Sequence, residues 1–327
     1  MRKCLNLIQK HFLSFALTQV SRLNHLLLKL RSRLKPLPVQ SSSLSQALSR
    51  EEIILKYVTP WARGIEIAPW CHPLISKKRG YQVEVLDIFD VHTLRQKCLQ
   101  DPLVSAYVQA IEEVDILSSA VEIDKAVETL GRLGAYDYII SSHNFEHLPD
   151  PLRFLQACAR VLKSGGILSM AIPDKRGTFD RFGGLTRTAD FLQYFLEERT
   201  RPSPFQIFAT GAYCLDGVSP FLLSENHHLS FRDPLQSCYQ GLLDRLQDPE
   251  PYCDTHISLL TAPAFKLILA ELNLLDLLPF QVLEITETVG FEFYVHLKNV
   301  GIEQAAAFKI SDAERVNLHQ ALLHQPL

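Results

Sequence analysis

Short apolar runs separated by polar turns predict a series of β-strands. Residues 63–69 and 81–90 are expected to be two strands, and the second alternates Val83, Val85 and Ile88 before it turns acidic. Residues 136–142 and 165–173 are continuous apolar runs, which is typical of strands in a parallel sheet covered on both faces. The pattern therefore favours a sheet whose strands are connected through helices.

A helix is expected between the last two of these runs. Leucine, alanine and valine recur there at steps of three and four residues from Leu152 to Leu162. Asp150 can cap the start, Pro151 suits the first turn, and Gly165 or Gly166 can end the helix with left-handed backbone geometry. Strand, helix and strand within about 35 residues form a right-handed parallel crossover.

The C-terminal third predicts a different end to the sheet. Residues 262–277 have the period of a helix, and residues 280–299 read as two alternating strands joined at a turn containing Gly290. We therefore predict an α/β fold with a doubly wound, Rossmann-like sheet, mostly parallel and closed by an antiparallel hairpin. The expected organisation is an extension and linker (1–45), a main domain (46–300) with an inserted substrate lid (177–261), and a helical tail (301–327).

The N-terminal extension differs in charge from the rest of the chain. Every charged residue up to Arg50 is Lys or Arg, and the apolar positions follow a helical period. Two interpretations stay open: a helix that lies on an anionic membrane surface, or a helix that packs on this domain or on a second subunit. We expect no membrane-spanning helix and no secretory signal there, because the apolar runs are too short.

Bulk composition narrows the class of protein. The chain has 327 residues, 47% of them hydrophobic and 21% charged, as in globular proteins, and its net charge of −3 gives no argument for a nucleic-acid partner. Its seven cysteines contain no CxxC pair, so neither a disulfide framework nor a zinc motif is indicated. We therefore expect a cytoplasmic protein, with peripheral contact at the inner face of the membrane if the extension binds lipid.

One family combines these elements. The order "GIEIAP", "VEVLDIFD", "YDYIISSHNFEHLPDP", "SGGILSMAIPDKR" and "GFEFYVHLK" resembles the class I S-adenosylmethionine-dependent methyltransferases from about residue 57 to residue 299. The resemblance is strongest to the branch with an "EHL.DP" helix entry. It implies an enzyme that uses S-adenosylmethionine to methylate an oxygen or nitrogen of a small molecule or glycan, and it extends to methyltransferases of surface-polysaccharide assembly.

The resemblance also implies where the cofactor binds. The loop after the first strand is expected under the methionine and ribose, and Asp87, 21 residues after Glu66, can accept the ribose hydroxyls. Asp124 or Glu122 is placed either near the adenine or in a solvated loop. The expected cofactor-binding residues are Gly64, Glu66, Ile67, Ala68, Pro69, Asp87, Ser142, His143 and His147.

The first loop departs from the family pattern because it is poor in glycine. Ala68 is small enough for close approach of a ligand, but Pro69 has no amide to donate. A non-catalytic module that retains the fold is therefore an alternative. A dinucleotide or nucleotide-sugar enzyme is disfavoured, because no GxGxxG motif follows the first strand.

Candidate catalytic residues follow two strands. His143 stands at the tip of one strand and could take a proton from the acceptor, while Glu146 and His147 brace the loop on the cofactor side. The charged run after the next strand begins with Asp174, which we also expect in the catalytic site. The expected acceptor-binding residues are Lys175, Arg176, His228 and His256.

A metal site is not expected from the spacing of histidines. His227 and His228, followed about 28 residues later by Asp254 and His256, match no closed zinc pattern. Contacts to the acceptor, or ordinary loop and core roles, are the interpretations that remain for these residues.

Overall fold

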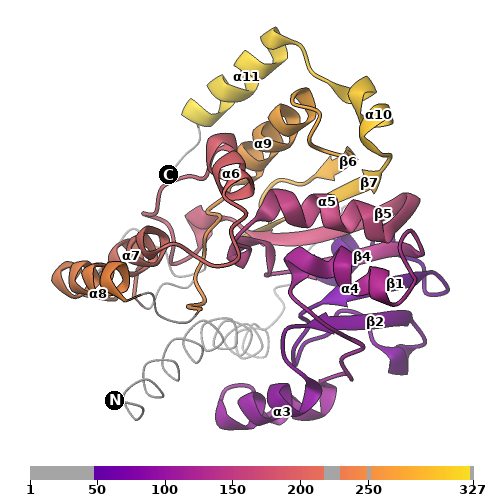
Figure 1. The fold of residues 1–327 in the computed structure, drawn as a ribbon, viewed down its shortest axis with the longest axis horizontal. Helices are drawn as coiled ribbons and strands as arrows, with labels where there is room; N and C mark the ends of the chain where they lie inside the picture. Colours follow the sequence, from indigo (N-terminus) through magenta and orange to yellow (C-terminus); the bar gives the residue numbers. More distant parts are fainter. Residues whose placement is uncertain (1–47, 217–228, 249–251, 325–327) are drawn as a thin grey trace, which may run out of the picture.

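One mixed sheet organises the protein. The computed structural model describes residues 48–216, 229–248 and 252–324 (Figure 1). Seven strands pair in the order β3-β2-β1-β4-β5-β7-β6. They are β1 (Arg63–Ile67), β2 (Gln82–Asp87), β3 (Ile116–Leu117), β4 (Tyr136–Ser142), β5 (Leu162–Pro173), β6 (Phe280–Ile285) and β7 (Glu292–Asn299). Strands β1 to β5 pair in parallel, whereas β7 runs antiparallel to β5 and β6. The predicted doubly wound sheet with its antiparallel hairpin is confirmed.

Helices cover the sheet and extend from one end of it. They are α2 (Arg50–Ile54), α3 (Val91–Gln100), α4 (Ile123–Thr129), α5 (Pro151–Val161), α6 (Thr188–Leu196), α7 (Pro204–Tyr213), α8 (Leu235–Gln247), α9 (Ala262–Leu274), α10 (Ile302–Ala305) and α11 (Asp312–Leu323). None of the helices in the described part of the chain has the length and apolarity needed to cross a bilayer. The basic extension and its linker, residues 1–45, lie outside the described residues.

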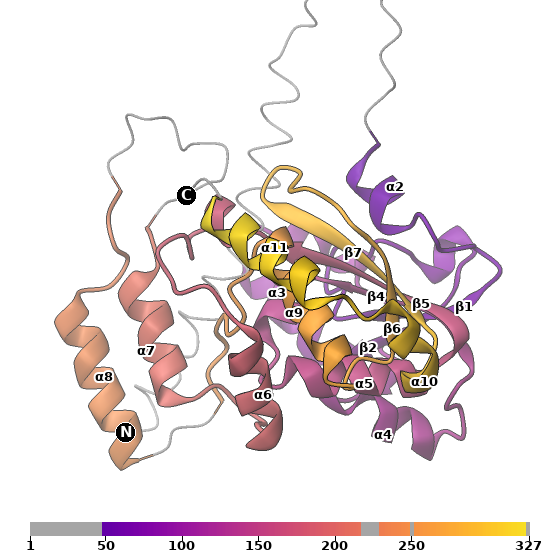
Figure 2. The ribbon, with the colours of Figure 1, turned by 90° about the horizontal axis from the view of Figure 1, so that it is seen from above.

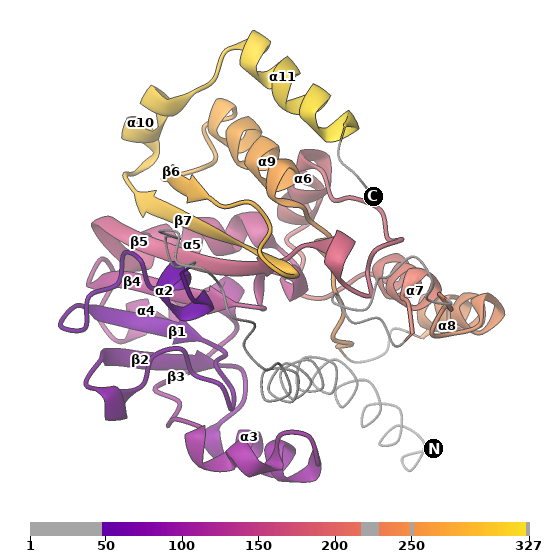
Figure 3. The same cartoon turned by 180° about the vertical axis from the view of Figure 1, so that it is seen from behind.

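Alternating side chains give the sheet two buried faces. Along β7, Phe293 and Val295 join the apolar cluster that contains residues of α4, α5 and α9, whereas Tyr294 joins a second cluster with Ile54 of α2. The period of two residues explains this division, since neighbouring side chains of a strand point to opposite faces. Figure 3, seen from behind, shows α2 over the face opposite to α5.

The crossover from β4 to β5 begins as predicted and ends differently. The carboxylate of Asp150 accepts a hydrogen bond from the amide of Arg153 at 2.9 Å, and Pro151 occupies the first turn of α5. No glycine cap follows, because the chain becomes extended directly at Leu162. Instead, the side-chain amide of Asn299 in β7 donates to the carbonyls of Ala159 (2.8 Å) and Leu162 (3.1 Å) at the end of the helix. A residue distant in the sequence thus satisfies this helix end.

The segment between β5 and α9 is divided in two: α6 packs on α5 and α9, whereas α7 and α8 lie beyond the sheet. Helices α7 and α8 pack side by side and stand apart from the strands (Figures 1 and 2). Residues 252–261, the returning segment, lead the chain back to the sheet, where the amides of Ile257 and Ser258 donate to the carbonyl of Glu146 at 2.7 and 3.1 Å. The amide of Lys175 also donates to the carbonyl of Leu260 at 2.9 Å. These backbone bonds fix the returning segment against the loop after β4.

Candidate functional site

The ends of β4 and β5 and the start of β7 meet at one edge of the sheet. Because β7 is antiparallel, its first residue, Glu292, pairs with Pro173 at the carboxyl end of β5. His143 follows the last residue of β4, so it lies at the same edge. The carboxyl edge of an open α/β sheet is where such folds bind their ligands.

His143 is held by its backbone and by its ring. Its φ of +50° lies in the left-handed region, which is uncommon for residues other than glycine and is often found at functional sites. Its amide donates to the carbonyl of Ala171 at 3.0 Å. The ring nitrogen Nε2 lies 2.8 Å from the carboxylate of Glu292, and Nδ1 lies 3.7 Å from that of Glu146. The strand-tip position predicted for His143 is therefore flanked by two carboxylates.

Glu292 is the centre of a buried polar network. Its carboxylate accepts hydrogen bonds from Arg50 Nε at 2.6 Å and from the hydroxyl of Tyr294 at 2.6 Å, in addition to its contact with His143. Burial favours the neutral carboxyl, but hydrogen bonds and charge from His143 and Arg50 outweigh it and lower the pKa of Glu292 to about 2. Arg50 also donates to the hydroxyl of Ser142 at 2.7 Å. The sequence analysis missed Arg50 and Glu292, although Glu292 is a lone acid beside the apolar run of β7.

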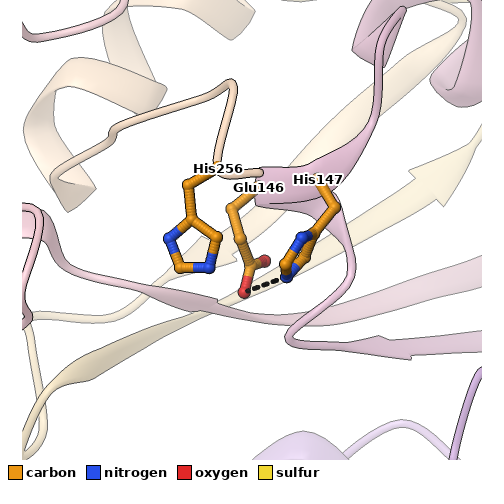
Figure 4. A group of neighbouring side chains, drawn as sticks. All are labelled: Glu146, His147 and His256. Atoms are coloured by element: carbon orange, nitrogen blue, oxygen red, sulfur yellow. Dashed lines mark ion pairs between the residues drawn. The ribbon is translucent and has the colours of Figure 1, made fainter. Parts of the chain in front are cut away.

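A second polar cluster lies beside the first. The short 3₁₀ helix η4 (Phe145–His147) carries Glu146 and His147, and the returning segment brings His256 next to them (Figure 4). The rings of His147 and His256 are perpendicular, with centroids 4.6 Å apart. Burial lowers the pKa of His147, but the charges of Asp254, Glu146 and Asp180 outweigh it and raise that pKa to about 9. The acidic side chains of this cluster thus favour a positive charge beside them.

The loop after β1 is shaped by a buried acid. The carboxylate of Glu66 accepts hydrogen bonds from the amides of Leu74 (2.8 Å) and Ile75 (3.3 Å), and burial raises the pKa of Glu66 to about 8. Ala68 and Trp70 have left-handed φ values of +47° and +44°. Two residues other than glycine therefore adopt the backbone geometry that glycines supply in a more typical loop.

Two neighbours of this loop face the protein interior. Ile67 packs in the main apolar core. A Cβ atom on Gly64 would lie 1.9 Å from the ring of Tyr138, so this glycine makes room for a side chain of β4. Any contact of these two residues with a cofactor would involve their backbone atoms.

Asp87, the acid expected to bind the ribose, lies at the end of a strand with few partners. It ends β2, is 5% exposed, and accepts one hydrogen bond from the amide of Phe89 at 3.0 Å. Burial raises its pKa to about 6, and no ion pair to this carboxylate is found among the described residues. An acid at a strand end with an oxygen left for a hydroxyl donor is the chemistry that a ribose diol requires.

The charged side chains after β5 bind other groups of the protein. Arg176 donates to both carboxylate oxygens of Asp174, at 2.9 and 2.6 Å, and the hydroxyl of Thr288 donates to the same group at 2.5 Å. Asp174 is fully buried, and these partners lower its pKa. The ammonium group of Lys175 donates to the carbonyl of Arg181 at 2.7 Å. This arrangement braces the end of β5 and argues against Asp174 as a proton acceptor.

Asp124 and Glu122, the two acids considered for the adenine, both form ion pairs within the protein. The carboxylate of Asp124 is fully buried and binds Arg153 at 2.7 Å and Arg160 at 2.5 Å, which joins α4 to α5. Glu122 pairs with Lys125 at 2.8 Å. His228, expected to contact the acceptor, lies outside the described residues.

A cavity of about 490 Å³ adjoins the second cluster. It lies between α6, α7 and the returning segment, and its wall includes His256, Tyr194, Gln206 and Arg187. The side-chain nitrogen of Gln206 is buried without a hydrogen-bond partner among the described residues.

Comparisons with known proteins find similarity to methyltransferases over part of the chain. Residues 62–209 match the family model described as "Methyltransferase domain". Ubiquinone biosynthesis O-methyltransferases are 37% identical over 60 residues in Xanthomonas campestris pv. campestris and 36% identical over 62 residues in Cronobacter sakazakii. Each match covers 17% of this chain. The chain spans about a quarter of the length of these relatives, 25% of the first and 26% of the second.

Solved structures of low sequence identity are also similar to this chain. A SAM-dependent methyltransferase from Aquifex aeolicus is 15% identical with a TM-score of 0.36, over 77% of this chain and 90% of the other. The PH0226 protein from Pyrococcus horikoshii is 13% identical with a TM-score of 0.36, over 76% and 87%. Residues 62–209 are thus similar to a methyltransferase domain, and the strand order agrees with the class I S-adenosylmethionine-dependent fold that the sequence resembles.

Proposed function

We propose that the protein transfers a methyl group to an oxygen or nitrogen of a polar small molecule or saccharide that binds in the cavity between α6, α7 and the returning segment. The observation that carries the proposal is the position of this cavity. Its wall includes His256, whose ring lies 4.6 Å from that of His147 in the loop after β4. Polar side chains line it, among them Thr186, Asp190 and Thr210.

The cofactor, when bound, supplies a methyl carbon that is electrophilic because it is attached to a sulfonium. The chain itself must hold that cofactor, align the acceptor and remove its proton. Asp87 would accept the ribose hydroxyls, and the left-handed residues Ala68 and Trp70 would shape the loop beneath it. Glu66 would contribute by holding this loop through the amides of Leu74 and Ile75.

His143 is the proposed proton acceptor. If Nε2–H donates to Glu292, the lone pair of Nδ1 remains available for a proton from the acceptor. A carboxylate that fixes the tautomer of a histidine in this way also stabilises the ring once it is charged. Glu292 would thus be a positioning residue for His143.

Two observations bear on the type of acceptor and on the alternative. The curated relatives are named O-methyltransferases, which supports an acceptor hydroxyl over an amine. The glycine-poor loop favours a non-catalytic module in which the fold and cofactor site are retained without methyl transfer. The two functions differ in whether any product forms.

The test uses S-adenosylmethionine with a labelled methyl group and panels of sugars, nucleotide sugars and phenols. We expect transfer to at least one hydroxyl-bearing class, and His143→Gln should lower kcat by about 100-fold or more. Asp174→Asn is the control, because it should affect stability more than chemistry. Cofactor binding without product from any panel would support the non-catalytic alternative.

Membrane contact of the basic extension is a separate proposal. It rests on the sequence of residues 1–45, in which every charged side chain is basic. Deletion of these residues should abolish sedimentation with anionic liposomes and leave cofactor binding intact. Unchanged sedimentation would refute membrane contact, and the result would have no bearing on methyl transfer.

A further inference from the structure

Two imidazoles and a carboxylate converge beside the acceptor cavity. One potential ligand atom from each of Glu146, His147 and His256 lies within 4.8 Å of the other two. Nε2 of His147 is 3.8 Å from the nearer oxygen of Glu146. Figure 4 shows the carboxylate of Glu146 between the two rings. These residues come from two segments that the returning chain brings together, so no local spacing motif could reveal them.

Each histidine is oriented by a carboxylate on its far side. Nδ1 of His147 lies 2.9 Å from Asp254, and Nδ1 of His256 lies 2.5 Å from Asp180. Nε2 is therefore the nitrogen left available on each ring. Histidines that bind metals almost always donate their other ring N–H to a carboxylate, a carbonyl or water, which fixes the tautomer and strengthens the ligand.

Glu146 supplies an independent indication of a missing ligand. It is 1% exposed, and its Oε2 atom is buried without a hydrogen-bond partner among the described residues. Its other oxygen lies 3.7 Å from Nδ1 of His143 and 3.8 Å from Nε2 of His147, and both distances exceed an ordinary hydrogen-bond length. A buried carboxylate normally has strong partners, because leaving it without them is costly. A cation between Glu146 and the rings would provide one.

We propose that Glu146, His147 and His256 bind a divalent transition-metal ion of the zinc type. Two imidazole nitrogens and one carboxylate oxygen are ligands that zinc and its neighbours accept, whereas magnesium prefers oxygen ligands alone. At bond lengths of about 2.0–2.1 Å, tetrahedral ligand atoms lie roughly 3.3 Å apart, so closure from the present separations needs small side-chain rotations. Three protein ligands leave a fourth position open.

The open position gives the site a role that deepens the proposed function and rests on it. Because His256 also lines the cavity, an ion held here would lie at the cavity wall and could bind an oxygen of the acceptor. A metal-bound hydroxyl loses its proton more readily. Metal binding itself does not depend on methyl transfer, so the two proposals can fail separately.

The test measures metal binding by the full-length protein after removal of metal with a chelator. Calorimetry with Zn²⁺ should show one site that is lost, with Kd raised more than about 100-fold, in His256→Gln and in the isosteric Glu146→Gln. Asp254→Asn should weaken binding about 10- to 100-fold, as expected for a residue that orients a ligand. The exposed His92, on α3, gives the matched control His92→Gln, which should bind as the wild type does.

Cobalt substitution identifies the ligands. Co²⁺ at this site should give visible d–d bands without the near-ultraviolet charge transfer of a thiolate ligand. Bands that include thiolate charge transfer, or His256→Gln protein that binds Zn²⁺ as tightly as wild type, would overturn the proposal. If Glu146→Gln does not fold, His256→Gln decides the question. Calorimetry with S-adenosylmethionine on the metal-free protein tests the cofactor site independently.

Discussion

Replacement of Glu292 by glutamine tests the network that holds His143. The change keeps the size of the side chain but removes the charge that Arg50 and His143 contact at 2.6 and 2.8 Å. The carboxylate is 4% exposed, so water cannot replace these partners. We expect Glu292→Gln to destabilise the folded protein and to loosen the orientation of His143.

The pKa of Glu292 gives the size of the effect. Its partners lower this pKa from 4.5 to about 2, and one pKa unit corresponds to about 1.4 kcal/mol, so the ionised carboxylate contributes on the order of 3 kcal/mol. Removal of one partner of a buried ion pair typically costs about 3–5 kcal/mol. Since Arg50 is 41% exposed and can be partly hydrated, we expect the lower end of that range. The corresponding fall in Tm is roughly 4–6 °C for a chain of this length.

Thermal and urea unfolding between pH 3 and pH 8 are the assays. A carboxyl whose pKa is lowered by folding stabilises the protein above its unfolded pKa of 4.5, and this contribution disappears as the pH falls towards 2. The difference between wild type and Glu292→Gln should thus be full at pH 7 and shrink below pH 4.5. Glu284→Gln is the matched control, because its pair with Lys56 is exposed, and it should leave Tm unchanged. Equal Tm values for wild type and Glu292→Gln at pH 7 would refute the reasoning.

Two further predictions concern the sheet. Gly64→Ala places a Cβ 1.9 Å from the ring of Tyr138 and should cost about 1–3 kcal/mol in urea unfolding, whereas Gly184→Ala, with open space around its Cβ, should be near neutral; equal stabilities would contradict the packing argument. Burial lowers the pKa of His296 to about 4, so the unfolded chain gains a proton that the folded chain does not as the pH falls from 6.5 to 4, and stability should be lost over that window. The loss should be smaller in His296→Gln, and an identical pH profile would exclude this histidine as its source.

The sheet could be predicted because its signals are local. The apolar runs of β4 and β5, Asp150 at the start of α5 and the turn at Gly290 each depend on neighbouring residues. The end of α5 could not be predicted in the same way, since Asn299, more than a hundred residues away, binds its carbonyls. The glycine expected there is within β5 instead, where Gly165 has a φ of +82°.

The sequence indicated where the candidate site lies, but it did not indicate which side chains contact one another there. The loop after β4 was identified because polar residues follow an apolar strand, and the structure places His143 there between two carboxylates. Its partner Glu292 comes from an antiparallel strand, and its neighbour Arg50 comes from α2, so only the fold brings them together. The charged run after β5 was expected to line the acceptor side, yet Asp174 and Arg176 bind each other.

Calorimetric titration with S-adenosylmethionine tests the central claim most directly. We predict measurable heat with one site per chain for the wild type, and loss of binding in Asp87→Ala, whose carboxylate is the proposed partner of the ribose hydroxyls. Asp90→Ala is a suitable control, because Asp90 caps α3 three residues later in the chain. The absence of heat at millimolar cofactor, or wild-type affinity in Asp87→Ala, would contradict the account.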